Sequence, residues 1–210
     1  MKEIRADAQS LYDHYEQGVR RQEIYERITE AIVAEVRRGQ TVCAAFYGHP
    51  GAFVYPSHEA VRRARAEGHS ARMLPAVSAE DCLFADLGVD PGEAGCQSYE
   101  ATDFLIRRRE VDPTAALILW QVAVIGEAVY STTPRKDGLA LLAEYLSTWY
   151  EAGHVVTLYE ASPYPLLEAI VATMPLVELP DAHATALSTL YVPPLEPRPR
   201  DTEMMDRLGL

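Results

Sequence analysis

The sequence predicts an α/β fold built of two α/β domains. Short apolar runs that end in turns containing Gly and Pro alternate with segments of helical periodicity, which is the pattern of strands followed by helices. The chain has 210 residues, of which 48% are hydrophobic and 24% charged, so it can bury a core of ordinary size. Gly and Pro gather in residues 87–95, which favours a domain boundary there. We therefore expect an N-terminal domain at residues 1–95, a second domain at 96–195 and a proline-rich tail at 196–210.

The first regular element is expected to be a helix at residues 22–38. Apolar residues recur at helical spacing from Ile24 to Val36, and Gly39 follows as a C-terminal cap. Residues 8–21 are polar, rich in tyrosine and interrupted by a glycine, so we expect a loop or short helical turns there.

A strand is expected at residues 41–47, followed by the turn Tyr47–Gly51 and a helix at residues 57–67. A strand that ends in a glycine-bracketed turn and continues into a helix is where open α/β sheets bind ligands, because the carboxyl edge of the strand is a crevice. Gly48 and Gly51 lack the Cβ that would keep a ligand away from the backbone. An ordinary strand-to-helix connection explains the same residues, and the pattern alone leaves both interpretations open.

A short strand at residues 71–74 and a helix that begins at Ser78 continue the alternation. Ser78 is a good N-cap, and Asp81 lies at the third helical position, where a carboxylate faces the free amides of the first turn. Strands and helices that alternate with short links indicate a largely parallel sheet.

The second domain is expected to alternate in the same way. Strands are expected at residues 96–101, 116–122, 155–160 and 189–192. Helices are expected at residues 139–152 and 164–172. The prolines of the tail keep it extended, and it closes with a short helical turn near residues 201–208.

Charge and composition exclude several functions. The net charge is −12, so the basic surface that binds nucleic acid is missing, and Arg107–Arg109 is interpreted as the solvated end of a helix. Three scattered cysteines are too few for a disulfide framework and indicate reduced residues of a cytoplasmic protein. No apolar run approaches the roughly 18 residues of a membrane span, and residues 1–7 lack the apolar core of a signal peptide, so we expect no membrane partner. His49 has no second ligand at metal-binding spacing, so we expect no metal site.

Four motifs, in order along the chain, carry a resemblance to a known family. They are Tyr47–Gly51 (Tyr-Gly-His-Pro-Gly), Pro75–Asp81, Phe84–Gly88 and Trp120-Gln121. Taken together they resemble the tetrapyrrole-methylase superfamily of methyltransferases that use S-adenosyl-L-methionine (SAM). Within that superfamily the chain is most similar to the borosin-type peptide backbone α-N-methyltransferases, the group that includes the omphalotin enzyme. The resemblance implies two α/β domains with the cofactor SAM in the cleft between them.

The resemblance also implies which residues contact SAM. They come from the glycine turn, from the start of the helix at Ser78 and from the second domain: Tyr47, Gly48, His49, Pro50, Phe53, Val54, Val77, Ser78, Ala79, Gln121, Tyr159 and Thr189. Backbone groups and a few side chains would hold the adenosine and methionine parts, while apolar walls exclude water from the methyl group.

The tyrosine-rich segment before the first long helix is the candidate catalytic group. Tyr12, Tyr15, Arg21 and Tyr25 reproduce the spacing of the tyrosines and arginine that the borosin group requires. Read without the resemblance, the same residues line a helix start, with Tyr25 on the core face beside Ile28.

Methylation of an amide nitrogen explains why these residue types are needed. The nitrogen lone pair is delocalised and the proton is not acidic at neutral pH, so the enzyme must remove the proton as the methyl group arrives. A phenolate whose pKa is lowered by a nearby guanidinium is a suitable base, and the guanidinium can also stabilise charge on the carbonyl oxygen. We therefore expect Tyr15 as the base, Arg21 and Tyr25 as stabilisers of the imidate oxygen, and Tyr12 as a positioning group.

Two departures from the family pattern shape the expected partners. The family opens with a Gly-rich strand that forms one wall of the SAM site, and nothing of that kind precedes Lys2. We expect a chain that is N-terminally truncated relative to the family, that receives this strand from another chain, or that no longer binds SAM. Fused members carry their own peptide at the carboxyl terminus, so we expect this chain to methylate a separate precursor peptide, as a homodimer by family analogy.

Two other functions remain open. A tetrapyrrole-methylase relative that acts on a small molecule would leave the segment from Tyr12 to Tyr25 facing solvent or core. A catalytically lapsed scaffold or partner subunit would explain the missing first strand.

Overall fold

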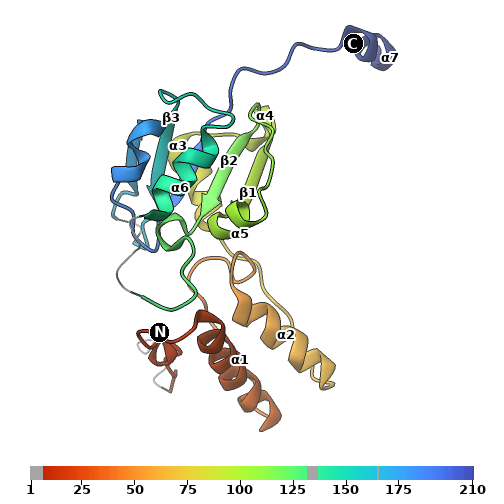
Figure 1. Ribbon diagram of the computed structural model, residues 1–210. Helices are drawn as coiled ribbons and strands as arrows, with labels where there is room; N and C mark the ends of the chain where they lie inside the picture. The colour runs from red at the N-terminus through yellow and green to blue at the C-terminus, as the bar shows by residue number, and fades with distance from the viewer. Residues whose placement is uncertain (1–6, 132–136, 165) are drawn as a thin grey trace. The chain divides into compact units, whose positions relative to one another are not determined.

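The computed structural model describes residues 7–131, 137–164 and 166–210, and the chain divides into two compact units (Figure 1). The first unit runs up to Cys82 and also includes the segment that starts at Gly126. The described residues of the second unit are 83–125, 137–164 and 166–210. Among the described helices, none is long and apolar enough to cross a bilayer.

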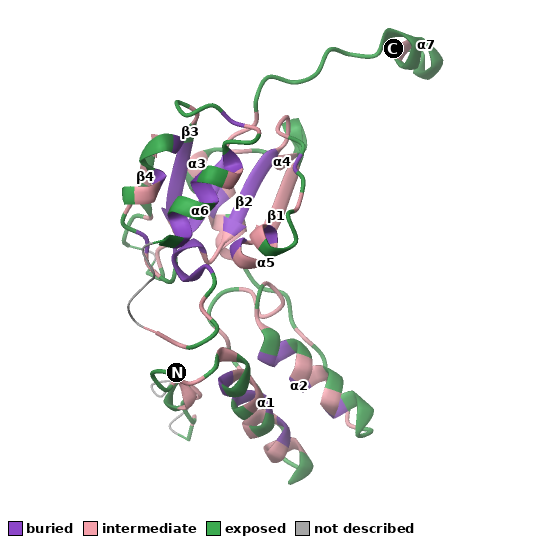
Figure 2. Cartoon of the chain, in the orientation of Figure 1, coloured by how far each residue is buried: buried purple, intermediate pink, exposed green. Residues whose placement is uncertain are grey.

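The first unit contains a short 3-10 helix, η1 (Tyr12–His14), and two long helices, α1 (Arg21–Arg37) and α2 (Tyr55–Ala66). Both long helices lie within two residues of the predicted bounds, so these predictions are confirmed. α1 packs along α2, and their apolar faces are buried as Figure 2 shows. The Tyr55 hydroxyl donates to a Glu26 carboxylate oxygen at 2.7 Å, which ties the two helices together at the surface.

The predictions of strands at residues 41–47 and 71–74 are wrong. Both segments are without regular secondary structure, and most of their residues are exposed. A strand requires a neighbouring backbone to complete its hydrogen bonds. Among the described residues, no backbone segment forms a ladder with either of them. The apolar residues of these segments predicted strands, but the described part of the chain provides no neighbouring strand with which they could pair.

The second unit is built on a five-stranded sheet in the order β1-β2-β5-β3-β4. The strands are β1 (Cys96–Glu100), β2 (Ala116–Trp120), β3 (Val155–Glu160), β4 (Ile170–Pro175) and β5 (Thr189–Val192). Four of them fall where the sequence predicts a strand. Together with the helices they confirm the α/β class.

The prediction of a largely parallel sheet is wrong, because the sheet is mixed. Only β1 and β2 run parallel, while β5 pairs antiparallel with β2 and β3, and β3 pairs antiparallel with β4. Antiparallel neighbours need no helical crossover. The helix predicted at residues 164–172 is also wrong, since Ile170 to Pro175 pair residue by residue with β3 as β4. The tertiary pairing outweighs the local helical pattern.

The core of the second unit lies where α5 (Ala101–Ile106) and α6 (Asp137–Leu146) pack against the sheet (Figure 1). Phe104 of α5, Leu142 and Leu146 of α6 and Leu119 of β2 are fully buried in this core. A Cβ on Gly138 would lie 2.9 Å from the Cβ of Ile125, so glycine permits the close approach of α6.

The remaining elements are short. They are α3 (Ala79–Leu87), α4 (Pro91–Ala94), η2 (Val122–Val124), η3 (Leu176–Asp181) and α7 (Thr202–Leu208). α7 confirms the helical turn predicted for the tail. α3 confirms the helix predicted from Ser78, and it positions two motifs of the candidate site.

Candidate functional site

The structure brings the four candidate catalytic residues together in the first unit. Tyr12 lies in η1, Tyr15 follows that helix directly, Arg21 is the first residue of α1, and Tyr25 lies one turn further along it. The ring centroids of Tyr12 and Tyr15 are 5.7 Å apart. Arg21 and Tyr25 are both near enough to Tyr15 to shift its pKa electrostatically. A segment of fourteen residues therefore folds back into one cluster.

A distant segment closes this cluster through a short antiparallel ladder. The N–H of Gly18 donates to the carbonyl of Tyr130 at 2.9 Å, and the N–H of Tyr130 donates to the carbonyl of Val19 at 2.8 Å. The N–H of Arg21 donates to the carbonyl of Ala128 at 3.0 Å. These bonds hold residues 126–130 against the residues that precede α1.

The ladder adds two side chains that the sequence analysis missed. A carboxylate oxygen of Glu127 lies 3.8 Å from a guanidinium nitrogen of Arg21. The ring of Tyr130 lies 5.2 Å from the ring of Tyr15 and 6.0 Å from the guanidinium carbon of Arg21. Both residues are about a hundred positions away in sequence, and the four residues from Glu127 to Tyr130 carry no periodicity that would single them out.

The expectation that a guanidinium lowers the pKa of the Tyr15 phenol is only half right. Burial raises the pKa of Tyr15 above its usual value, and the phenol of Tyr25 raises it further, while Arg21 lowers it. Desolvation of the charged form is the largest of these effects. Tyr15 is therefore protonated at neutral pH in this structure.

Arg21 retains unused capacity to donate hydrogen bonds. Its Nε atom is buried and has no hydrogen-bond partner among the described residues. Buried donors are normally satisfied, so an orphaned one marks a place where an acceptor can bind. The carbonyl oxygen of a substrate is such an acceptor.

The glycine turn is held in shape by its own hydrogen bonds. The N–H of Gly51 donates to Nδ1 of His49 at 2.9 Å, and Nε2 of His58 lies 3.0 Å from the carbonyl oxygen of Gly51. The Ser57 hydroxyl donates to the carbonyl of Val54 at 2.8 Å. Gly48 has φ +70°, a conformation that glycine adopts without strain.

Exposed aromatic and apolar side chains occur in the turn, just after it and just before α3. Tyr47 is 64% exposed, Phe53 47% and Val77 62%, although all three are large and apolar. Phe53 has φ 56°, which is rare for an aromatic residue, and residues in such strained conformations cluster at functional sites. Exposed apolar side chains beside a glycine turn are suited to the flat face of a ligand.

Ser78 and Asp81 form a capping box at the start of α3. The N–H of Asp81 donates to the Ser78 hydroxyl at 3.2 Å, and the N–H of Ser78 donates to an Asp81 carboxylate oxygen at 2.6 Å. The Ser78 hydroxyl, which also donates to that carboxylate at 2.6 Å, and the Ser78 N–H together lower the pKa of Asp81. The prediction of Ser78 as the N-cap is confirmed, and the next residue, Ala79, is the first residue of α3.

The other three candidate cofactor contacts lie in the second unit. Gln121 follows β2 with φ 59°, a left-handed conformation that is uncommon outside glycine. Tyr159 and Thr189 face each other across β3 and β5, and both are buried. The hydroxyl of Tyr159 donates to an Asp86 carboxylate oxygen at 2.6 Å. The candidate cofactor residues thus form two groups, one in each unit.

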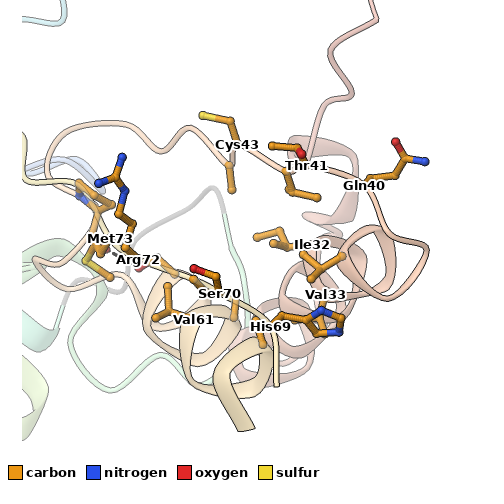
Figure 3. Close-up of a pocket in the computed structure, with 18 of the residues that line it drawn as sticks. Ile32, Val33, Gln40, Thr41, Cys43, Val61, His69, Ser70, Arg72 and Met73 are labelled. Atoms are coloured by element: carbon orange, nitrogen blue, oxygen red, sulfur yellow. Dashed lines mark hydrogen bonds between the residues drawn. The ribbon is translucent and has the colours of Figure 1, made fainter. Parts of the chain in front are cut away.

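The first unit also contains a cavity of about 640 Å³ between α1, α2 and the two segments at 40–46 and 69–74 (Figure 3). Its walls are largely apolar, with Ile32, Val33 and Val61 facing it from the helices. Of the candidate site residues, only Pro50 lines it. Within the described parts of the chain, no cluster of His, Cys, Asp and Glu could hold a metal ion.

The fold is similar to that of solved uroporphyrin-III methyltransferases. The structure of uroporphyrin-III-C-methyltransferase from Thermus thermophilus matches with a TM-score of 0.57 and 19% identity, over 80% of this chain and 70% of that one. A structure of uroporphyrin-III C-methyltransferase from Thermus thermophilus complexed with S-adenosylhomocysteine matches with a TM-score of 0.55 and 16% identity, over 82% of this chain and 73% of that one. The chain therefore has the fold of a methyltransferase of this class.

A family model described as tetrapyrrole (corrin/porphyrin) methylases matches residues 2–176. The chain belongs to this family, whose methyl donor is SAM. The resemblance read from the four motifs is thereby confirmed.

Curated relatives are considerably more similar than the solved structures. A methyltransferase/ribosomally synthesized cyclic peptide gymnopeptides precursor of Gymnopus fusipes is 42% identical over 205 residues, which are 95% of this chain and 49% of the relative. The corresponding omphalotin A precursor of Omphalotus olearius is 40% identical over 205 residues, with the same coverage of 95% and 49%. The chain spans about half the length of these relatives.

Proposed function

We propose that this chain is a SAM-dependent methyltransferase that methylates backbone amide nitrogens of a separate precursor peptide. The observation that carries the proposal is the cluster of Tyr12, Tyr15, Arg21 and Tyr25, in which an arginine with an unused buried donor lies beside several phenols. The names of the similar relatives, which join a methyltransferase with a cyclic peptide precursor, support the same substrate class.

The cluster supplies what amide methylation requires. Tyr15 is the base, and because burial raises its pKa, its phenolate is scarce at neutral pH but a strong proton acceptor. Arg21 donates through its free Nε to the carbonyl oxygen, on which negative charge develops as the proton leaves. Tyr25 assists at that oxygen, and Tyr12 positions the Tyr15 ring that it contacts.

SAM, when bound, supplies an electrophilic methyl group. The glycine turn fits such a ligand at Gly48, where among the described residues only the carbonyl oxygen of Val77, at 3.7 Å, lies within 4 Å of an ideal Cβ, so the backbone there is open to approach. Tyr47 to Pro50, Phe53 and Val54 hold the ligand from this turn.

The other proposed contacts differ in how directly they act. Val77, Ser78 and Ala79 lie at the start of α3, and Gln121 offers a side-chain amide at the end of β2. Thr189 is buried beside Tyr159. The Tyr159 hydroxyl is engaged by Asp86, so this tyrosine supports the site rather than donating to the ligand. The active protein is proposed to be a homodimer.

The decisive experiment joins binding with product analysis. The purified chain is titrated calorimetrically with SAM and with S-adenosylhomocysteine, and is then incubated with SAM and peptides encoded by neighbouring genes. Mass spectrometry with fragmentation should locate added methyl groups on backbone nitrogens. Tyr15→Phe should lower the rate of product formation by about 10²-fold or more, while Tyr164→Phe, which alters an exposed tyrosine of the second unit, should leave it unchanged.

Other outcomes overturn the proposal in favour of named alternatives. Binding of SAM with methyl transfer to a tetrapyrrole but to no peptide supports a small-molecule enzyme, which the fold of the solved neighbours favours. A folded chain that binds neither SAM nor S-adenosylhomocysteine supports a scaffold or partner subunit.

A further inference from the structure

The Arg21 guanidinium needs a counter-charge, and Glu127 provides one. The side chain of Arg21 is 21% exposed and that of Glu127 only 5%. A carboxylate so thoroughly removed from water is costly unless charged or hydrogen-bonding groups face it. The carboxylate lies 3.8 Å from the guanidinium, a separation at which two opposite charges attract strongly in a partly dry environment.

The backbone fixes this pair independently of the side chains. An antiparallel bridge joins Arg20 to Val129, and the bond from the Arg21 N–H to the carbonyl of Ala128 continues it. Glu127 is therefore brought to α1 by a ladder and not by chance proximity of two long side chains. Such an arrangement is rigid enough to orient a catalytic guanidinium.

Tyr130, on the same segment, connects the remaining members of the cluster. Its side chain forms a hydrogen bond with that of Tyr12. The ring of Tyr130 lies beside the ring of Tyr15 and faces the guanidinium of Arg21. It thus contacts three of the four proposed catalytic residues. Neither Tyr130 nor Glu127 is among the residues that the sequence motifs single out.

We propose that Glu127 and Tyr130 are positioning residues of the methyl-transfer site, with Glu127 holding the Arg21 guanidinium in place and Tyr130 fixing the rings of Tyr12 and Tyr15. The proposal rests on the proposed function, because it assigns these side chains to the same site. Neither residue needs to touch the peptide or SAM.

Glu127 has an electrostatic consequence that a purely structural residue would lack. The groups that face Tyr15 are the phenols of Tyr12, Tyr25 and Tyr130 and the guanidinium of Arg21. The negative charge of Glu127 offsets part of the positive field of Arg21. Removing that negative charge strengthens the field at Tyr15 and favours its phenolate, so the pKa of Tyr15 should fall.

The test compares Glu127→Gln with Glu127→Asp and with a matched control. Glu23→Gln serves as the control, because Glu23 pairs with Arg27 on the exposed surface of α1 in the same unit. Two quantities are measured: the tyrosine titration of the free chain by ultraviolet difference absorbance, and the pH dependence of kcat with SAM and the peptide found to be methylated.

For Glu127→Gln we expect a tyrosine titration and a kcat profile that both move to lower pH, with a plateau kcat about tenfold to a hundredfold lower because Arg21 is no longer held. KM for SAM should stay unchanged. Glu127→Asp keeps the charge, so its profile should keep the wild-type midpoint, while its shorter reach lowers kcat. Tyr130→Phe keeps the ring and loses the hydroxyl, and its kcat should fall several-fold without a change in SAM affinity.

The result that overturns the inference is a Glu127→Gln protein whose titration and kcat profile are those of Glu23→Gln. If Glu127→Gln does not fold, Glu127→Asp decides, and an unchanged kcat in that variant overturns the inference. An unchanged kcat in Tyr130→Phe removes Tyr130 from it. If the proposed function itself is wrong, the wild-type chain methylates no peptide. The tyrosine titration of the free chain still shows in that case whether Glu127 affects the pKa of the cluster.

Discussion

Substitution of Gly51 by alanine tests the assignment of the glycine turn to SAM. An alanine Cβ would lie 2.9 Å from the sulfur of Met73, 3.0 Å from Cε1 of His49 and 3.2 Å from Nδ1 of His49. Real Cβ atoms essentially never approach a heavy atom as closely as 2.9 Å, and distances of 3.0 and 3.2 Å are tighter than most real Cβ contacts, so both neighbours must shift. The sulfur belongs to a flexible side chain and can move at small cost. The imidazole is less free, because its Nδ1 accepts the hydrogen bond from the Gly51 N–H at 2.9 Å.

The magnitude follows from what the ring loses. Displacing it weakens one hydrogen bond, worth about 0.5–1.5 kcal/mol, and overpacking of a fitted site costs about 1–3 kcal/mol in total. The turn lies at the surface, so most of this cost should appear as a changed turn rather than an unfolded unit. We expect the affinity for SAM to fall by about 5- to 150-fold, the factor that corresponds to about 1–3 kcal/mol.

The assay is calorimetric titration of Gly51→Ala with SAM and with S-adenosylhomocysteine. Gly153→Ala is the matched control, because a Cβ at Gly153 meets no atom within 4 Å and its φ is not in the left-handed region. The control should bind both ligands like the wild-type chain. A Gly51→Ala protein that is folded and binds SAM with unchanged affinity would refute the assignment of this turn to the cofactor.

Three further predictions concern catalysis and stability. Tyr15→Phe should lower kcat by about 10²-fold or more with unchanged SAM affinity. Because burial raises the pKa of Tyr15, the kcat of the wild-type chain should rise about tenfold per pH unit from neutral pH to beyond pH 10. A stopped-time methylation assay measures both quantities. Leu142→Ala should lower the free energy of unfolding by about 2–5 kcal/mol in urea titration, because Leu142 is fully buried, and the exposed Leu141→Ala should change it by less than about 0.5 kcal/mol. The ion pairs of Asp103 with two arginines lower its pKa and should contribute less than about 1 kcal/mol to the free energy of unfolding at pH 7. Because the pKa of Asp103 is lower in the folded chain than in the unfolded chain, this contribution should be lost as the pH falls through the two pKa values. Equal losses of stability for Asp103→Asn at pH 7 and pH 2 would contradict this prediction.

The elements that the sequence predicted well are those whose signals are local. The helix expected at residues 22–38 is α1, because spacing of apolar residues and a following glycine act within one segment. The capping box of Ser78 and Asp81 spans only four residues and forms as expected. Local rules sufficed wherever the partners of a residue lie on the same turn.

The strand predictions failed where the outcome depends on a distant partner. Residues 41–47 are apolar enough for a strand, yet the described backbone offers no neighbour to pair with them. A helix was predicted at residues 164–172, yet Ile170–Pro175 form β4, because all six of these residues pair with β3. Periodicity reports which side chains prefer burial, but pairing decides whether an extended segment becomes a strand.

The candidate site shows the same division. Tyr12 to Tyr25 lie within fourteen residues, so their gathering could be predicted from the resemblance of their spacing. Glu127 and Tyr130 join them only through a ladder between distant segments. The direction of the Tyr15 pKa shift could not be predicted either, since it depends on burial, which the sequence does not specify.

These contacts separate the two parts of the proposed chemistry within the first unit. The bonds that shape the glycine turn run among His49, Gly51 and His58, whereas the bonds that shape the tyrosine cluster run from residues 18–21 to residues 128–130. These two sets of bonds have no residue in common, so a change in the turn should alter cofactor affinity and leave the pH dependence of kcat intact. A change at Glu127 should do the reverse. If both groups belonged to one continuous network, each substitution would change both the cofactor affinity and the pH dependence of kcat. The comparison therefore decides whether cofactor binding and proton removal depend on separate sets of contacts in this protein.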